Sequence, residues 1–172
     1  MHAAALIAAE QAHAVAHLSR QYLTFQLKGE SYAVPIESIK EIIEVASLTA
    51  VPMMPSFVRG VMNLRGAVIP VIDLAVHFGV DATVTARRTC IVIFEVQAAS
   101  GELQTLGVLV DAVNEVLDIA ESDVEPAPAL GTHIPPDFIR GMAKVRGRLV
   151  IALDLERVLS IDELARLAGG TA

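Results

Sequence analysis

The chain has 172 residues, is 53% hydrophobic but only 4% aromatic, and carries a formal net charge of −7. This length allows one ordinary domain, or two very small ones that share an interface and an aliphatic core. The negative charge argues against a nucleic-acid partner, which would require a basic surface.

The N-terminal segment predicts a helix. Residues 3–20 are strong helix formers without glycine or proline, and their few large apolar side chains recur at roughly helical spacing. We therefore assign residues 1–20 to an N-terminal helix with a thin apolar face.

From Gln21 the apolar pattern changes to a period of two, which predicts strands. Residues 22–27 and 31–36 flank a glycine-containing turn and predict a β-hairpin. Residues 36–45 begin at helical spacing and end in alternation, so we expect one short turn that leads into a strand. The proline-rich residues 51–55 predict a loop.

One segment of the chain is repeated. Residues 57–74 return as residues 138–155 at a constant offset of 81 residues (138 − 57). Both copies predict a turn, then two strands around an Arg-Gly dipeptide, then a helical turn with Asp73 or Asp154 as its N-cap. The first of these turns is expected at residues 57–60. Such a repeat predicts two copies of one supersecondary unit, and hence two subdomains with a seam between them. The identical pairs are Phe57/Phe138, Arg59/Arg140, Gly60/Gly141, Arg65/Arg146, Gly66/Gly147, Asp73/Asp154 and Leu74/Leu155.

The second half of the chain follows the order of the first. Residues 88–96 and 103–110 predict a hairpin, and residues 108–119 match residues 34–45. The connection to the second repeat copy is longer, and its extra length falls in residues 126–135, a loop by composition.

These short, evenly spaced strands with glycine turns predict an all-β protein made of two five-stranded antiparallel barrels. We assign residues 21–160 to one domain with repeat units near 22–79 and 88–160, and a strand exchange between the halves is allowed. Residues 160–163 form a capping box, so residues 161–172 are expected to form a C-terminal helix and tail.

Two charged residues recur in otherwise apolar surroundings. Arg65 and Arg146 each precede a glycine at the tip between two strands. Glu41 and Glu115 occupy matching positions at an offset of 74 residues (115 − 41). An isolated turn arginine is usually just solvated. Two further interpretations stay open for Glu41 and Arg65: an ion pair within one subdomain, or half of a recognition patch.

The first half also carries more large apolar side chains than one barrel face can bury. They either cover the seam or form an exposed patch for a partner, which methionine would make adaptable. These residues are Val34, Ile36, Ile39, Val51, Met53 and Met54.

No catalytic pattern stands out, and we expect no enzyme activity, metal or cofactor. His13 and His17 are four residues apart on the expected helix, but the glutamate of the zinc-protease motif and a third ligand are missing. There is no glycine-rich phosphate loop, histidine-based triad or close carboxylate pair.

The composition also bears on the compartment. Cys90 is the only cysteine and lies in an apolar run, so a disulfide framework is excluded and a buried side chain in a reducing cytoplasm fits. No apolar stretch is long enough for a spanning helix, and the first residues lack the basic region of a secretory signal.

The sequence resembles the CheW family of bacterial chemotaxis coupling proteins over about residues 21–159. The match is strongest in residues 57–74, whose pattern Gly-x-x-Asn-Leu-Arg-Gly-x-x-x-Pro-x-x-Asp-Leu is specific to that family. Residues 32–36 and 39–42 match the family's upstream segment. The resemblance implies two SH3-like five-stranded barrels, in agreement with the repeat.

The function that this resemblance implies is that of a cytoplasmic, non-catalytic adaptor recruited to receptor arrays. Its partners would be the regulatory domain of the histidine kinase CheA, at exposed barrel ends, and the cytoplasmic tip of a methyl-accepting chemoreceptor, at the groove between the barrels. End-to-end pairing of barrels would allow self-association in rings. Ile39, Glu41 and Arg65 fall on positions that the family uses for partner contacts. The full set of expected partner-binding residues is Ile39, Glu41, Arg65, Gly66, Gly60, Val34 and Ile36.

This chain departs from the family pattern in two places. The N-terminal segment is longer than a minimal family member needs, and Lys144 stands where the first repeat copy has Asn63, so we expect function to concentrate on the first copy. Only about a dozen residues follow Leu159, so no receiver domain of the CheV type is expected. An adaptor of a twitching-motility or surface-sensing pathway and a small metal-dependent enzyme using His13 and His17 remain as alternatives.

Overall fold

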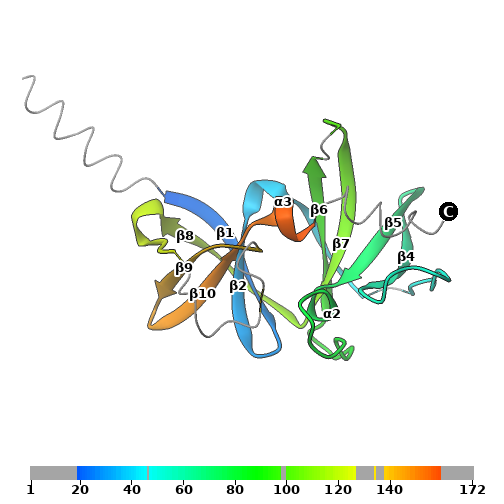
Figure 1. Ribbon diagram of the computed structural model, residues 1–172, viewed down its shortest axis with the longest axis horizontal. Helices are drawn as coiled ribbons and strands as arrows, with labels where there is room; N and C mark the ends of the chain where they lie inside the picture. The colour runs from blue at the N-terminus through cyan, green and yellow to red at the C-terminus, as the bar shows by residue number, and fades with distance from the viewer. Residues whose placement is uncertain (1–18, 46, 98–99, 127–133, 135–137, 160–172) are drawn as a thin grey trace, which may run out of the picture.

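The computed structural model describes residues 19–45, 47–97, 100–126, 134 and 138–159 (Figure 1). Ten strands dominate these ranges, and the helical elements are single turns. In chain order the elements are β1 (Ser19–Leu27), β2 (Glu30–Pro35), η1 (Ile36–Ser38), β3 (Ile39–Glu44), β4 (Val58–Leu64), β5 (Ala67–Asp73), α2 (Leu74–His77), β6 (Cys90–Gln97), β7 (Leu103–Val110), β8 (Ala112–Ala120), η2 (Glu121–Asp123), β9 (Ile139–Val145), β10 (Arg148–Leu153) and α3 (Leu155–Val158).

The strands form two five-stranded sheets that lie side by side (Figure 1). One sheet has the order β3-β6-β7-β5-β4 and is called barrel I here; the other has the order β8-β1-β2-β10-β9 and is called barrel II. The expected all-β class with two five-stranded units is confirmed, but the sheets are not purely antiparallel as expected, because β2 pairs with β10 and β5 with β7 in parallel.

Each barrel takes strands from both halves of the chain. The hairpin β1-β2 pairs with β8 and β10 in barrel II, whereas the hairpin β6-β7 pairs with β3 and β5 in barrel I. The two repeated segments supply β4-β5 to barrel I and β9-β10 to barrel II. The barrels are therefore joined by exchanged hairpins, and neither half of the chain contains all the strands of one barrel.

Three clusters of buried apolar side chains hold this arrangement together. One lies between the sheets and includes Phe25 from barrel II and Phe94 from barrel I, each 1% exposed. The second fills barrel I around Ile91 and Ile93, and the third fills barrel II around Tyr22. The largest cluster is thus the seam, as expected when two small units share an interface.

Most of the expected elements are confirmed, including both hairpins, the short turn before β3 and the strand pair of each repeat copy. One expectation was wrong in part: Phe57 lies in a turn, but residues 58–60 belong to β4, in which Val58 and Gly60 pair with Ile72 and Val71 around a bulge. The expected loop at residues 51–55 lies between β3 and β4, outside any strand.

The expectations at the chain ends are tested only in part. Ser19 and Arg20 belong to β1, where they pair with Ala120 and Ile119, so the N-terminal helix does not extend to residue 20. The rest of that expected helix, the C-terminal helix and most of the loop at 126–135 lie outside the described residues.

The expected helix caps are confirmed. The Asp73 side chain accepts a hydrogen bond from Ala75 N at the start of α2, and the Asp154 side chain accepts one from Arg157 N at the start of α3. A side-chain oxygen at this position satisfies a backbone N–H that has no partner within the helix.

Gly60 and Gly141 recur because a neighbouring backbone segment crosses each of them closely. An added Cβ at Gly60 would lie 2.7 Å from the carbonyl oxygen of Thr49, and one at Gly141 would lie 2.8 Å from that of Glu125. Both crossing segments form bridges to the residue that follows the glycine, Thr49 to Val61 and Glu125 to Met142. Gly60, which we expected among the partner-binding residues, thus has a structural role of its own.

The substitution Gly60→Ala is expected to lower the free energy of unfolding by about 2–3 kcal/mol, because the backbone of Thr49 must shift to admit the methyl group. Urea denaturation measures this loss. Gly101→Ala is the matched control, since its Cβ would meet nothing within 4 Å and only its positive φ of 89° is penalised, by about 1 kcal/mol. Equal losses in the two variants would contradict the packing argument.

The buried phenol of Tyr32 makes stability depend on alkaline pH. Burial, followed by the charge of Glu30 and the hydrogen bond that Tyr32 Oη donates to Glu30 Oε2, raises the pKa of Tyr32 above its ordinary value. The folded state therefore holds this proton more tightly than the unfolded state, whose tyrosine titrates near about pH 10. This contribution to stability is complete below that pH and is lost progressively as the pH rises above it toward the higher pKa of the folded state.

The free energy of unfolding is thus expected to fall as the pH rises from about 9 to 11, and the fall should be shallower in Tyr32→Phe. Urea denaturation at each pH measures both slopes. An unchanged slope in the variant would show that another group controls alkaline stability.

Candidate functional site: a duplicated ion pair at the barrel ends

The hairpin between β4 and β5 presents Arg65 at its tip. Arg65 and Gly66 are the two central residues of the turn, with φ values of 51° and 88°, as a type I′ turn requires. The side chain of Asn63 supports the turn by accepting a hydrogen bond from Gly66 N at 2.9 Å. An arginine with positive φ is uncommon and mildly unfavourable, so its presence calls for a role of its side chain.

That side chain forms an ion pair with Glu41. Arg65 Nη1 lies 2.7 Å from Glu41 Oε2, and Nη2 lies 3.2 Å from Glu41 Oε1, so the contact is bidentate. Glu41 belongs to β3 at the opposite edge of barrel I, and the pair therefore links the two edge strands of the sheet. Arg65 remains 74% exposed, which leaves its guanidinium accessible to a partner.

The second copy repeats this arrangement on barrel II. Arg146 has a φ of 51° and precedes Gly147, and its Nη1 lies 3.0 Å from Glu115 Oε1. Glu115 lies on β8 and Arg146 on the turn between β9 and β10, the positions that Glu41 and Arg65 hold in barrel I. Both open interpretations of Glu41 with Arg65 are compatible with this geometry, because the pair forms within one barrel and is exposed.

Exposed apolar side chains accompany both ion pairs at matching positions. Ile42 and Val116, each next to the glutamate, are 44% and 45% exposed, and Val68 and Leu149, three residues after the arginine, are 69% and 58% exposed. Exposed aliphatic side chains beside a solvent-accessible ion pair are typical of a protein-binding surface. We call Glu41, Ile42, Arg65 and Val68 surface I, and Glu115, Val116, Arg146 and Leu149 surface II.

The other residues expected to contact partners lie elsewhere. Val34 is fully buried in the seam cluster, and Ile39 is partly buried against it, so both support the interpretation that these side chains cover the seam. Ile36 lies in η1 and is half-buried. Val51 and Met53 are exposed, Met53 by 83%.

Val68 and Leu149 were not expected from the sequence. Both lie in continuous apolar runs, in which the alternation that separates the two faces of a strand is absent. Their shared offset of 81 residues (149 − 68) was the available signal, since it keeps a large aliphatic residue at the same exposed position in both copies.

Other candidate chemistry finds no support in the described ranges. They contain no group of three metal-binding side chains, and His13 and His17 lie outside them. Cys90 is half-buried, and burial raises the pKa of its thiol, which disfavours the reactive thiolate. No helix in the part of the chain that is described has the length and apolar character to cross a membrane.

Comparisons with known proteins agree with this architecture. A family model described as the CheW-like domain matches residues 21–163. The chain is 30% identical over 154 residues to the chemotaxis protein CheW of Rhizobium meliloti (strain 1021), covering 88% of this chain and 96% of that protein. It is 32% identical over 149 residues to the CheW of Treponema pallidum (strain Nichols), covering 86% of each.

Two further similarities extend this picture. Protein FrzA of Myxococcus xanthus is 28% identical over 134 residues, which cover 78% of this chain and 80% of that protein. The crystal structure of the scaffolding protein TtCheW from Thermoanaerobacter tengcongensis matches with a TM-score of 0.73 at 33% identity, covering 83% of this chain and 89% of that one.

Proposed function

This chain belongs to the family of CheW-like domains, and from that premise we propose that it is a non-catalytic adaptor that couples methyl-accepting chemoreceptors to the histidine kinase CheA. The observation that carries the proposal is the duplicated surface, an exposed ion pair with two exposed aliphatic side chains at the same place on each barrel. Such surfaces suit protein partners rather than a small substrate.

The kinase regulatory domain is proposed to bind surface I. Arg65 is 74% exposed in this ion pair, so its guanidinium can exchange Glu41 for a contact across an interface at little cost. Ile42 and Val68 supply apolar area beside it. Charged groups of this kind set the orientation and association rate of a complex, and the aliphatic side chains supply part of its affinity.

Surface II gives the chain a second binding surface, on barrel II. A protein with two similar surfaces on opposite units can join two partners, and successive contacts of this kind close into a ring when the rotation between them allows it. We propose that surface II contacts a further adaptor copy, so that kinase regulatory domains held at surface I are joined into rings and extended arrays.

The receptor tip is proposed to dock where the barrels meet. A concave site of about 260 Å³ lies there, lined by Leu27, Tyr32, Phe78 and Val80 among others. Leu27 and Tyr32 come from the β1-β2 hairpin of barrel II, and Phe78 and Val80 follow α2, which comes directly after β5 of barrel I. An apolar groove of this kind accepts the apolar face of a helical hairpin.

A binding assay with purified components tests the proposal. The full chain is titrated with the regulatory domain of CheA and, separately, with the cytoplasmic hairpin fragment of a methyl-accepting receptor. Saturable binding of both is expected, and failure to bind either would overturn the adaptor assignment. A pull-down from the source cells then identifies which kinase and receptors are used, and so decides between flagellar chemotaxis and another array pathway.

A further inference from the structure

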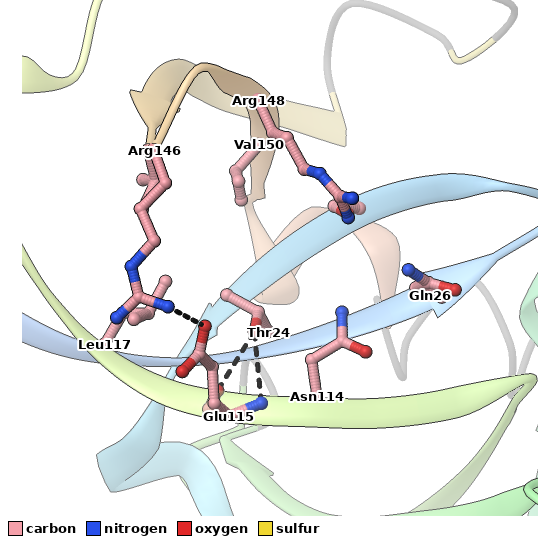
Figure 2. Close-up of a pocket in the computed structure, with 10 residues that line it drawn as sticks. Thr24, Gln26, Asn114, Glu115, Leu117, Arg146, Arg148 and Val150 are labelled. Atoms are coloured by element: carbon pink, nitrogen blue, oxygen red, sulfur yellow. Dashed lines mark hydrogen bonds and ion pairs between the residues drawn. The ribbon is translucent and has the colours of Figure 1, made fainter.

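The end of barrel II contains a pocket of about 350 Å³ beside the Glu115–Arg146 pair (Figure 2). Arg146 and Arg148 extend from the β9-β10 hairpin on one side, and Thr24 and Asn114 lie on β1 and β8 on the other. The Arg146 side chain points to Glu115, whereas the Arg148 side chain extends toward Gln26 at the opposite side of the pocket (Figure 2).

Barrel I has a larger side chain at the position that matches Thr24. Thr24 pairs with Ala33 and Glu115, and the residue in the same register of barrel I is Ile93, which pairs with Gly107 and Glu41 and is fully buried. Thr24 is smaller, and its hydroxyl is held at 3.0 Å from the carbonyl oxygen of Glu115.

The strand β9 adds to the difference. Ala143, which pairs with Val150, takes the place of Met62, which pairs with Ile69 in barrel I. At these two positions barrel II thus has threonine and alanine in place of the bulkier isoleucine and methionine of barrel I, and Thr24 is one of the residues that line the pocket.

The two barrel ends also differ in charge. In barrel I, Lys40 pairs with Glu95 at 3.7 Å, in addition to the pair of Glu41 with Arg65. The matching residues of Lys40 and Glu95 in barrel II are Asn114 and Gln26, both uncharged.

Arg148 adds a charge that barrel I lacks, because its counterpart there is Ala67. Arg148 has no ion pair among the described residues, whereas Arg146 is paired with Glu115. The pocket lining therefore holds two guanidinium groups and one carboxylate, which leaves one unbalanced positive charge.

We propose that this pocket binds a carboxylate group carried on a short apolar stem. Arg148 would hold the carboxylate, since a guanidinium binds a carboxylate through two parallel hydrogen bonds, and the amides of Gln26 and Asn114 offer further donors. Val150, which is 4% exposed, and its neighbours Val145 and Leu117 provide an apolar floor for the stem. The carboxylate of Glu115 disfavours a multiply charged anion such as phosphate.

Butyrate is a minimal probe of this chemistry. In ¹⁵N-resolved NMR of the full chain, butyrate is expected to produce saturable shifts confined to β8, β1 and the β9-β10 hairpin, with about millimolar affinity. Its neutral isostere butyramide should produce none. A partner's glutamate side chain offers the same chemistry, and the capped peptide acetyl-Ala-Glu-Ala-amide represents that source. If butyrate binds, the ligand of the pocket is a free carboxylate. If only the peptide binds, the ligand is the glutamate side chain of a partner.

Two substitutions that copy barrel I test the site. Arg148→Ala removes the cation and Thr24→Ile fills the pocket, and each is expected to weaken binding of the active probe about tenfold or more. Arg88→Ala, an exposed arginine outside the pocket, is the matched control and should bind as the wild type does. The proposal is overturned if neither probe binds, or if binding persists in Arg148→Ala, whose fold can be checked in the same spectra.

Discussion

The substitution Arg65→Glu is expected to weaken binding of the kinase regulatory domain about 100-fold, which corresponds to about 2.7 kcal/mol. It replaces the cation of surface I with a carboxylate that faces Glu41 across the space the ion pair now occupies, at 2.7 Å between Arg65 Nη1 and Glu41 Oε2. The surface thereby changes from a balanced pair to two negative charges. Isothermal titration calorimetry with the purified regulatory domain measures the change.

Stability measurements separate this effect from unfolding. Arg65 is 74% exposed, and exposed ion pairs contribute about 0–1 kcal/mol, so the free energy of unfolding should change little. Arg146→Glu is the matched control, because it reverses the same charge in the same turn on barrel II. If kinase affinity falls equally in both variants, or in neither, surface I is not the specific kinase contact.

The substitution Asp73→Ala is expected to lower the free energy of unfolding by about 3–5 kcal/mol. Asp73 is 1% exposed, and its carboxylate accepts hydrogen bonds from Thr83 N at 2.9 Å, Thr83 Oγ1 at 3.1 Å and Arg59 Nη1 at 3.0 Å. It also caps α2 through Ala75 N. Removing the carboxylate leaves buried donors without an acceptor and Arg59 without its counter-ion.

Asp154→Ala provides the comparison within the same chain. Asp154 holds the matching place in the second copy, but its side chain is 37% exposed and its cap to Arg157 N is long, at 3.4 Å. The loss should be about 1 kcal/mol, typical of a helix cap. Chemical denaturation measures both variants, and similar losses would mean that capping alone explains Asp73.

The two aspartates also illustrate what the repeat could and could not predict. Their identity and position predicted the caps correctly, because an N-cap depends on a few adjacent residues. The network around Asp73 could not be predicted, because Thr83 lies in the segment that follows α2 and reaches Asp73 only through the folding of that segment. In the second copy the counterpart of Arg59 is Arg140. Its Nη2 lies 4.0 Å from Glu121 Oε1, so this arginine forms its ion pair with a glutamate and not with the capping aspartate.

The exchange of hairpins between the barrels follows the same logic. Alternating apolar residues predict a strand and its hairpin partner, and β1-β2 and β6-β7 were both expected on that basis. Periodicity does not specify which barrel a hairpin joins, and that choice rests on the pairs β1-β8 and β2-β10 in barrel II and β3-β6 and β5-β7 in barrel I. Buried residues such as Val34 were accordingly expected at a surface or at a seam, and only the packing of Val34 against strands of the other barrel distinguishes these cases.

The candidate site was predicted by residue but not by extent. Glu41 and Arg65 were singled out as charges in apolar surroundings, and their ion pair is present. Function was expected to concentrate on the first copy because Lys144 replaces Asn63, which supports the Arg65 turn through Gly66 N. The second copy nevertheless keeps both the turn conformation and the ion pair, so surface II preserves the geometry without that support.

The proposed adaptor has to hold a receptor tip and a kinase regulatory domain at the same time. Surface I and the groove at the seam are formed by different residues, so one chain can bind both partners together. Analytical ultracentrifugation of the full chain with both partners measures this directly. The account predicts a ternary complex that sediments faster than either binary complex. Competition between the two partners for one chain, with no ternary species at saturating concentrations, would contradict it.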